Sequence, residues 1–128
     1  MKKFYKDDNK TINPELIEEA EENAGKISGI SSTQMRRIFN QFKHLNSRIE
    51  KEGWEKIEPL VRLQKAQLEY TIKRAINYNK KHEDQWGNLK KILQDGFDRV
   101  KTAEDYKVLT MYIEALYAYF YANTNQKN

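Results

Sequence analysis

The chain has 128 residues, 38% of them apolar and 33% charged, which is the size and balance of one ordinary globular domain. It contains no cysteine, so disulfide bonds and thiolate metal sites are excluded. The net charge of +4 is uneven, because residues 1–30 hold five lysines and seven acidic residues (−2), which leaves 18 basic and 12 acidic residues (+6) for residues 31–128.

The amino-terminal part of the chain is polar and lacks the apolar core of a signal peptide. Residues 1–12 carry no periodic pattern, and we expect them to fray. Asn13-Pro14 is a typical helix start, with an N-cap and a proline in the first turn, and it predicts an acidic helix from Glu15 to Asn23. We therefore assign residues 1–30 to an amino-terminal arm with a short acidic helix, and residues 31–128 to a helical bundle domain.

A second helix of about 20 residues is predicted after Ser31, which can accept a hydrogen bond from the Gln34 amide in a capping box. Gly53 provides the stop. The apolar residues of this segment recur at spacings of three and four, and so form one stripe: Met35, Ile38, Phe39, Phe42, Leu45 and Ile49.

For the third helix, Pro59 is expected in the first turn, and the helix should run to about Lys80. One apolar stripe contains Ile57, Val61, Leu68 and Ile72, and a second begins with Leu60, Leu63 and Tyr70. Two stripes indicate more than one neighbour, so we expect this helix to lie at the centre of the bundle.

Two further helices complete the pattern. Trp86, Leu89, Leu93 and Phe97 mark the fourth, which Gly96 weakens by about 1 kcal/mol relative to alanine. The fifth follows a capped start at Thr102 and is apolar nearly all round, which is unusual for a surface helix of a monomer. Since no segment alternates with the period of a strand, the sequence predicts an all-α, single-domain bundle of about five helices with mostly antiparallel neighbours.

The usual signatures of catalysis and cofactor binding are missing. The sequence has two histidines, no His-x-x-x-His pair, no phosphate-binding glycine loop and no nucleophile elbow. We therefore expect no enzymatic activity, no metal, no cofactor and no small-molecule substrate. The longest apolar run, Ala115 to Ala122, is too short for a membrane span, so we expect a cytoplasmic protein without a membrane partner.

Basic side chains border the apolar stripe of the second helix on both sides. Arg36 and Lys43 lie on one flank, Arg37 and Arg48 lie on the other, and both flanks are free of acidic residues. The third helix adds four more basic residues: Arg62, Lys65, Lys73 and Arg74. Such groups can follow a phosphate backbone, although solvated helix faces with local ion pairs explain them equally well.

Three blocks of the sequence together resemble the small subunit of type III-A CRISPR RNA-guided effector complexes, the Csm complexes. The blocks run from Ser31 to Phe39 (SSTQMRRIF), from Leu68 to Arg74 (LEYTIKR) and from Met111 to Tyr119 (MYIEALYAY). The resemblance rests on the order and spacing of the blocks. It covers residues 30–122 and does not include the amino-terminal arm.

This resemblance implies a helical subunit that stacks in copies beside other subunits of the complex and lines the groove holding guide RNA and target RNA. It implies no active site. A subunit that accepts any guide reads backbone and shape, which requires basic groups without base-specific pockets. The resemblance implies phosphate contacts by the basic residues that lie within the matching blocks, Arg36, Arg37 and Arg74. Position on the helices alone adds four further candidates: Lys43, Arg48, Lys65 and Lys73.

Three other functions fit parts of the sequence. A helical DNA-binding regulator would place the Ser31-capped helix in a major groove, although no helix-turn-helix pattern is evident. A purely structural protein would bind a partner helix through its apolar carboxy-terminal helix. A small ribonuclease would use His44 as an acid or base.

Overall fold

The structure, a computed structural model, describes residues 1–125 and the side chains of residues 1–123. Over these residues it contains five α-helices, a short 3-10 helix and no strand beyond an isolated bridge between Tyr5 and Ile12. The elements are α1 (Glu15–Gly25), α2 (Ser32–Glu52), α3 (Trp54–Tyr78), η1 (Lys80–His82), α4 (Glu83–Asp98) and α5 (Ala103–Asn125). The predicted all-α bundle is confirmed.

Side-chain caps set two of the helix starts, as the sequence predicts. The hydroxyl oxygen of Ser31 accepts the Gln34 amide at 3.1 Å before α2. Before α5, Thr102 Oγ1 accepts the Asp105 amide at 3.1 Å, and the Asp105 carboxylate accepts the Thr102 amide at 3.2 Å. These reciprocal bonds satisfy amides that have no partner within the helix.

The start of α3 differs from the prediction. Gly53 adopts a φ of 94°, which reverses the chain within one residue, so α3 begins at Trp54. Pro59 consequently lies inside the helix and not in its first turn, where it removes one backbone hydrogen bond. The helix ends at Tyr78, slightly before the expected Lys80.

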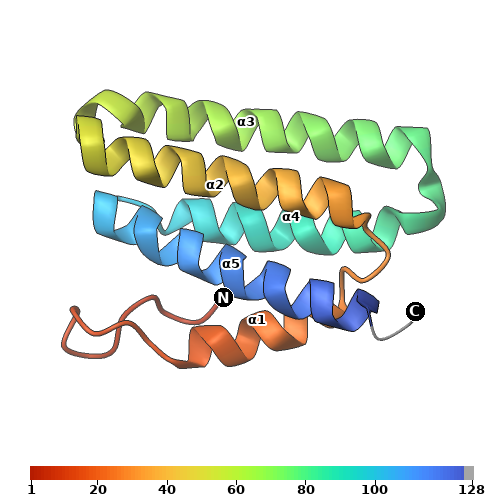
Figure 1. Ribbon diagram of the computed structural model, residues 1–128, viewed down its shortest axis with the longest axis horizontal. Coiled ribbons are helices and arrows are strands. Elements are labelled where there is room, and N and C mark those ends of the chain that lie inside the picture. The colour runs from red at the N-terminus through yellow and green to blue at the C-terminus, as the bar shows by residue number, and fades with distance from the viewer. Residues whose placement is uncertain (126–128) are drawn as a thin grey trace.

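The centre of the bundle is α5, so the prediction that the third helix lies there is wrong. Figure 1 shows α3 at one edge of the bundle and α1 at the other. Leu63 and Tyr70 of the second α3 stripe are 51% and 63% exposed, because no helix among the described residues covers that side. On α5, by contrast, seven large apolar side chains are buried: Tyr106, Val108, Leu109, Tyr112, Ile113, Leu116 and Phe120.

The apolar character of α5 is explained within one chain, because α1 covers a face that would otherwise be exposed. Leu16, Ala20 and Ala24 of α1 are buried, and α1 and α2 both pack against α5. The Tyr112 hydroxyl accepts a hydrogen bond from the Asn23 amide of α1 at 2.7 Å. A second copy is therefore not needed to bury this helix.

Residues 1–12 are folded onto the bundle and do not fray. The Lys6 amide donates to the Thr11 carbonyl at 2.8 Å and closes a turn, while Phe4 is buried. The Tyr5 hydroxyl donates to Asp105 at 2.7 Å. The arm is thus anchored to the first turn of α5.

Gly96 of α4 leaves room for the side chain of Leu109 on α5. A Cβ atom at this position would lie 2.6 Å from Cδ1 of Leu109, which is closer than two carbon atoms can approach. The cost of glycine in a helix interior is therefore offset by the packing of the Leu109 side chain against this position.

Candidate nucleic-acid interface

The long helices α2 and α3 form an antiparallel hairpin around Gly53 and lie side by side (Figure 1). Between them runs a groove of about 200 Å³. Its lining is made of amide, imidazole and leucine side chains, without an acidic residue: Gln41, His44, Leu45, Leu60, Leu63, Gln64 and Gln67.

Three of the predicted site residues share the face that carries this groove. Arg37 lies one turn before Gln41, and Arg48 lies one turn after His44, so both continue the α2 side of the groove. Arg74 lies seven residues after Gln67 and continues the α3 side. The tertiary structure therefore brings together arginines that are more than 20 residues apart in the sequence.

The three arginines differ in how free their charges are. Arg48 contacts Glu52 at 2.7 Å, and Lys56 contacts the same carboxylate at 3.0 Å. Hydrogen bonds from Arg48 and Lys56 lower the pKa of Glu52 to about 2, so this carboxylate is ionised and neutralises part of the local charge. Arg37 and Arg74 are exposed, and neither pairs with a carboxylate in the described part of the chain.

Arg74 is held in place by an aromatic ring. Its guanidinium carbon lies 5.6 Å from the centre of the Tyr70 ring, within the range of a cation-π interaction. The ring occupies one face of the planar guanidinium and leaves its N–H groups free to donate. This geometry suits an anionic acceptor.

Arg36 and Lys43 lie on the opposite flank of α2, toward α5. The Lys43 ammonium is 5.3 Å from the centre of the Phe39 ring, which in turn stacks on Tyr117 of α5 at 5.5 Å. Both basic residues are exposed. They extend the basic surface of α2 away from the groove.

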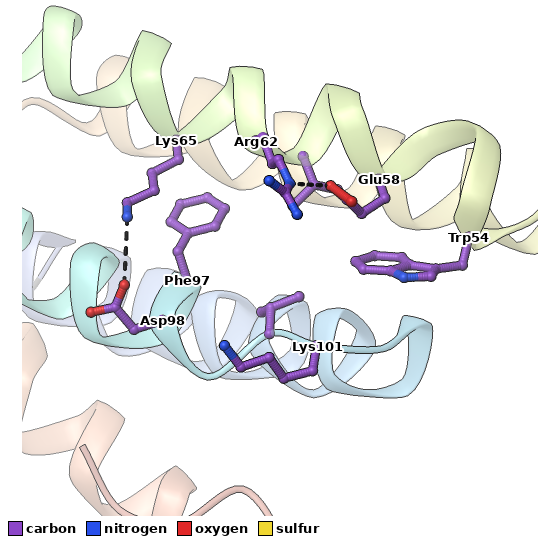
Figure 2. A pocket seen from close by; sticks show the side chains of 9 residues that line it. Trp54, Glu58, Arg62, Lys65, Phe97, Asp98 and Lys101 are labelled. Carbon is purple, nitrogen blue, oxygen red and sulfur yellow. Dashed lines mark hydrogen bonds and ion pairs between the residues drawn. The ribbon is translucent and has the colours of Figure 1, made fainter.

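Lys65 and Lys73 lie on the other side of α3, away from the groove. Lys65 borders a cavity of about 670 Å³ between α3 and the α4–α5 connection, and its ammonium contacts Asp98 at 3.5 Å. Figure 2 shows Lys65 directed at Asp98 and Arg62 paired with Glu58 across the cavity from Lys101. Two of the three cations here are matched by carboxylates, so this cavity attracts an anion less than the groove does.

His44 is exposed in the groove, and within the described residues no hydrogen bond or ion pair orients its ring. General acid-base catalysis by histidine usually depends on such an orienting partner. A search of the described residues finds no group of three metal-binding side chains. It also finds no helix long and apolar enough to cross a membrane.

The sequence-based prediction overlooked the α3 side of the groove. Leu60, Gln67 and Arg74 repeat at intervals of seven, which is a helical face, yet only the apolar members had been assigned to a stripe. It also overlooked Lys101 and Trp54 in the larger cavity, because residues in connections and first turns carry no periodic signal.

Comparison with protein families matches the chain to the family described as Csm2 Type III-A over residues 10–125. Searches of curated proteins and of solved structures return no match. The matched range includes the three sequence blocks and the whole of the α2–α3 hairpin.

Proposed function

Since the chain belongs to the Csm2 Type III-A family and is thus a structural subunit of a type III-A CRISPR complex, we propose that it holds guide RNA and target RNA by their backbones. It works beside the other subunits of that complex. On this proposal it catalyses no reaction and needs no metal or cofactor, and its role is to position RNA.

The observation that carries this proposal is the face of the α2–α3 hairpin. There Arg37 and Arg74 pair with no carboxylate of the described residues, and they lie beside a groove whose lining has no acidic residue. Guanidinium groups donate to phosphate oxygens in a bidentate geometry, and they do so without regard to base sequence. Arg48 is a weaker contact, because Glu52 competes for it.

The remaining basic candidates extend this surface on both sides. Arg36 and Lys43 contribute from the α5 side of α2, while Lys65 and Lys73 contribute from the outer side of α3. Because these residues point in different directions, one RNA strand does not contact all of them on a single copy. We assign them to the flanks of the bound duplex or to its neighbouring strand.

We also propose that copies of the chain stack head to tail. Helix α1 contains five glutamates and no basic residue, whereas α3 contains five basic and three acidic residues. These helices lie at opposite edges of the bundle (Figure 1). Complementary surfaces on opposite edges generate an open stack and not a closed dimer.

A titration tests the RNA proposal. The purified chain is mixed with RNA duplex, single-stranded RNA and DNA duplex of unrelated sequences at several salt concentrations. Binding to RNA that is independent of sequence and falls steeply with salt is the expected result. Sequence-selective binding to duplex DNA would instead identify a regulator, and RNA cleavage lost in His44→Ala would identify an enzyme.

A further inference from the structure

The groove between α2 and α3 has a chemistry of its own, separate from the arginines beside it. Gln41 and Gln67 are exposed amides on opposite walls, and Leu60 and Leu63 form an apolar wall on α3. An amide side chain offers both a donor and an acceptor. The groove therefore suits a ligand that is apolar on one side and carries hydroxyl groups on another.

Gln64 is a buried amide in the lining of the groove, and its incomplete hydrogen bonding favours a polar ligand. Gln64 is 3% exposed, and its Oε1 accepts a hydrogen bond from Tyr106. In the part of the chain that the structure describes, its Nε2 meets no acceptor. Buried donors without partners are uncommon in native proteins, so Gln64 is a lining residue whose hydrogen bonding is incomplete among the described residues.

The neighbouring arginines identify the ligand. Arg37, Arg48 and Arg74 continue the two walls of the groove, so a bound polymer with phosphates at the arginines would place the unit between its phosphates in the groove. In RNA that unit is ribose, which has C–H groups for the leucines and a 2′-hydroxyl that both donates and accepts.

Resting on the proposed RNA-holding function, we propose that the α2–α3 groove binds the ribose edge of RNA and distinguishes RNA from DNA through the 2′-hydroxyl. Gln41 and Gln67 supply the hydrogen bonds, and the leucine wall supports the sugar. The arginines provide affinity that does not depend on the sugar. The preference for RNA is thus separate from the strength of phosphate binding.

The test compares two duplexes of the same sequence and the same A-form shape, one of RNA and one of 2′-fluoro RNA, which lacks the hydroxyl donor. Fluorescence anisotropy at one salt concentration measures Kd for the full-length chain. We expect about tenfold tighter binding to RNA, the effect of one or two hydrogen bonds. In Gln41→Leu/Gln67→Leu, Kd for RNA rises to the value for 2′-fluoro RNA and the preference disappears.

Two controls make the result specific. Asn40→Leu places the same apolar side chain on the exposed surface of α2 outside the groove, and we expect it to keep the tenfold preference. Arg74→Gln weakens both duplexes equally and also keeps the preference. Thermal unfolding of each variant shows that the chain remains folded, as expected for exposed positions.

The outcomes separate the two proposals. If the unmodified chain binds both duplexes equally, or if the double variant retains the preference, the ribose groove is disproved while RNA binding stands. If the unmodified chain binds neither duplex at any salt concentration, the proposed RNA-holding function itself fails.

Discussion

The Tyr106 hydroxyl donates a 2.6 Å hydrogen bond to Oε1 of Gln64 in the interior of the bundle, and so joins α5 to α3. Both side chains are buried. Burial raises the pKa of the Tyr106 phenol far above its ordinary value, so the group remains a neutral donor. The pair is a polar contact in a mostly apolar core.

We expect the energies of this pair to be non-additive. Tyr106→Phe removes the donor to a buried carbonyl, and Gln64→Leu leaves a buried hydroxyl unpaired, so each substitution lowers the free energy of unfolding by about 1–3 kcal/mol. The double variant loses less than the sum, because no polar group is left unpaired. Urea unfolding of the four proteins measures the coupling, and purely additive effects would contradict the contact.

Alanine substitutions at the two glycines of α4 are expected to change the stability of the chain in opposite directions. At Gly96 the new methyl group would lie 2.6 Å from Leu109 Cδ1, so Gly96→Ala is expected to destabilise the chain by about 1–3 kcal/mol. At Gly87 no atom of the described residues lies within 4 Å of the new atom, and Gly87→Ala should stabilise the helix by about 0.5–1 kcal/mol. Thermal unfolding of both variants checks the sign, and equal effects would contradict the close approach of the Leu109 side chain to Gly96.

The ion pairs of Asp95 should make the free energy of unfolding fall in acid. Its carboxylate contacts the Met1 ammonium at 2.5 Å and Arg99 at 3.3 Å. Burial opposes ionisation, but the hydrogen bond from Met1 and the charge of Arg99 outweigh it, so the pKa of Asp95 lies below its ordinary value. A lowered pKa in the folded state stabilises the protein above the unfolded pKa of about 4, and this contribution is lost as the pH falls through the folded pKa.

Asp95→Asn therefore lowers the free energy of unfolding at pH 7 by about 1 kcal/mol, a modest value because the carboxylate is partly exposed to solvent. The difference between the variant and the unmodified chain should shrink below about pH 4. Urea unfolding across this pH range measures it. A difference that is constant with pH would show that the ion pair is not responsible.

Reversing the charge at the hairpin face tests the RNA contacts. Arg37→Glu and Arg74→Glu each remove one phosphate contact, which should weaken RNA binding and lower the slope of log K against log salt by about 0.7–0.9. Lys26→Glu is the matched control, since Lys26 is exposed at the end of α1, the helix at the opposite edge of the bundle from α3 (Figure 1). If the control weakens binding as much, net charge and not this face controls affinity.

Self-association is expected to depend on the acidic face of α1. Glu18 and Glu22 are exposed one turn apart, so Glu18→Lys/Glu22→Lys reverses that face without disturbing the core. Sedimentation at increasing protein concentration should show weaker association for this variant, and added salt should weaken association of the unmodified chain. Association that is unchanged by either would place the contact elsewhere.

Local patterns along the chain were sufficient to predict the helices. The capping box at Ser31, the stop at Gly53 and the capped start at Thr102 all have physical effects within one turn of the backbone. The apolar stripe of α2 likewise identifies its buried face, because helical periodicity is a property of a single segment. The position of Pro59 was wrong, since Gly53 lets α3 restart at once.

Which helices are neighbours was decided by tertiary packing. Periodicity shows that α5 is apolar on every side but does not show that α1 folds back to cover it, or that Leu63 remains exposed. For the same reason, the sequence could not show that of the seven basic candidates only Arg37, Arg48 and Arg74 share the groove face. The sequence of a helix shows which of its faces is buried. Which helix covers that face, and which residues lie beside it, depend on contacts between distant segments.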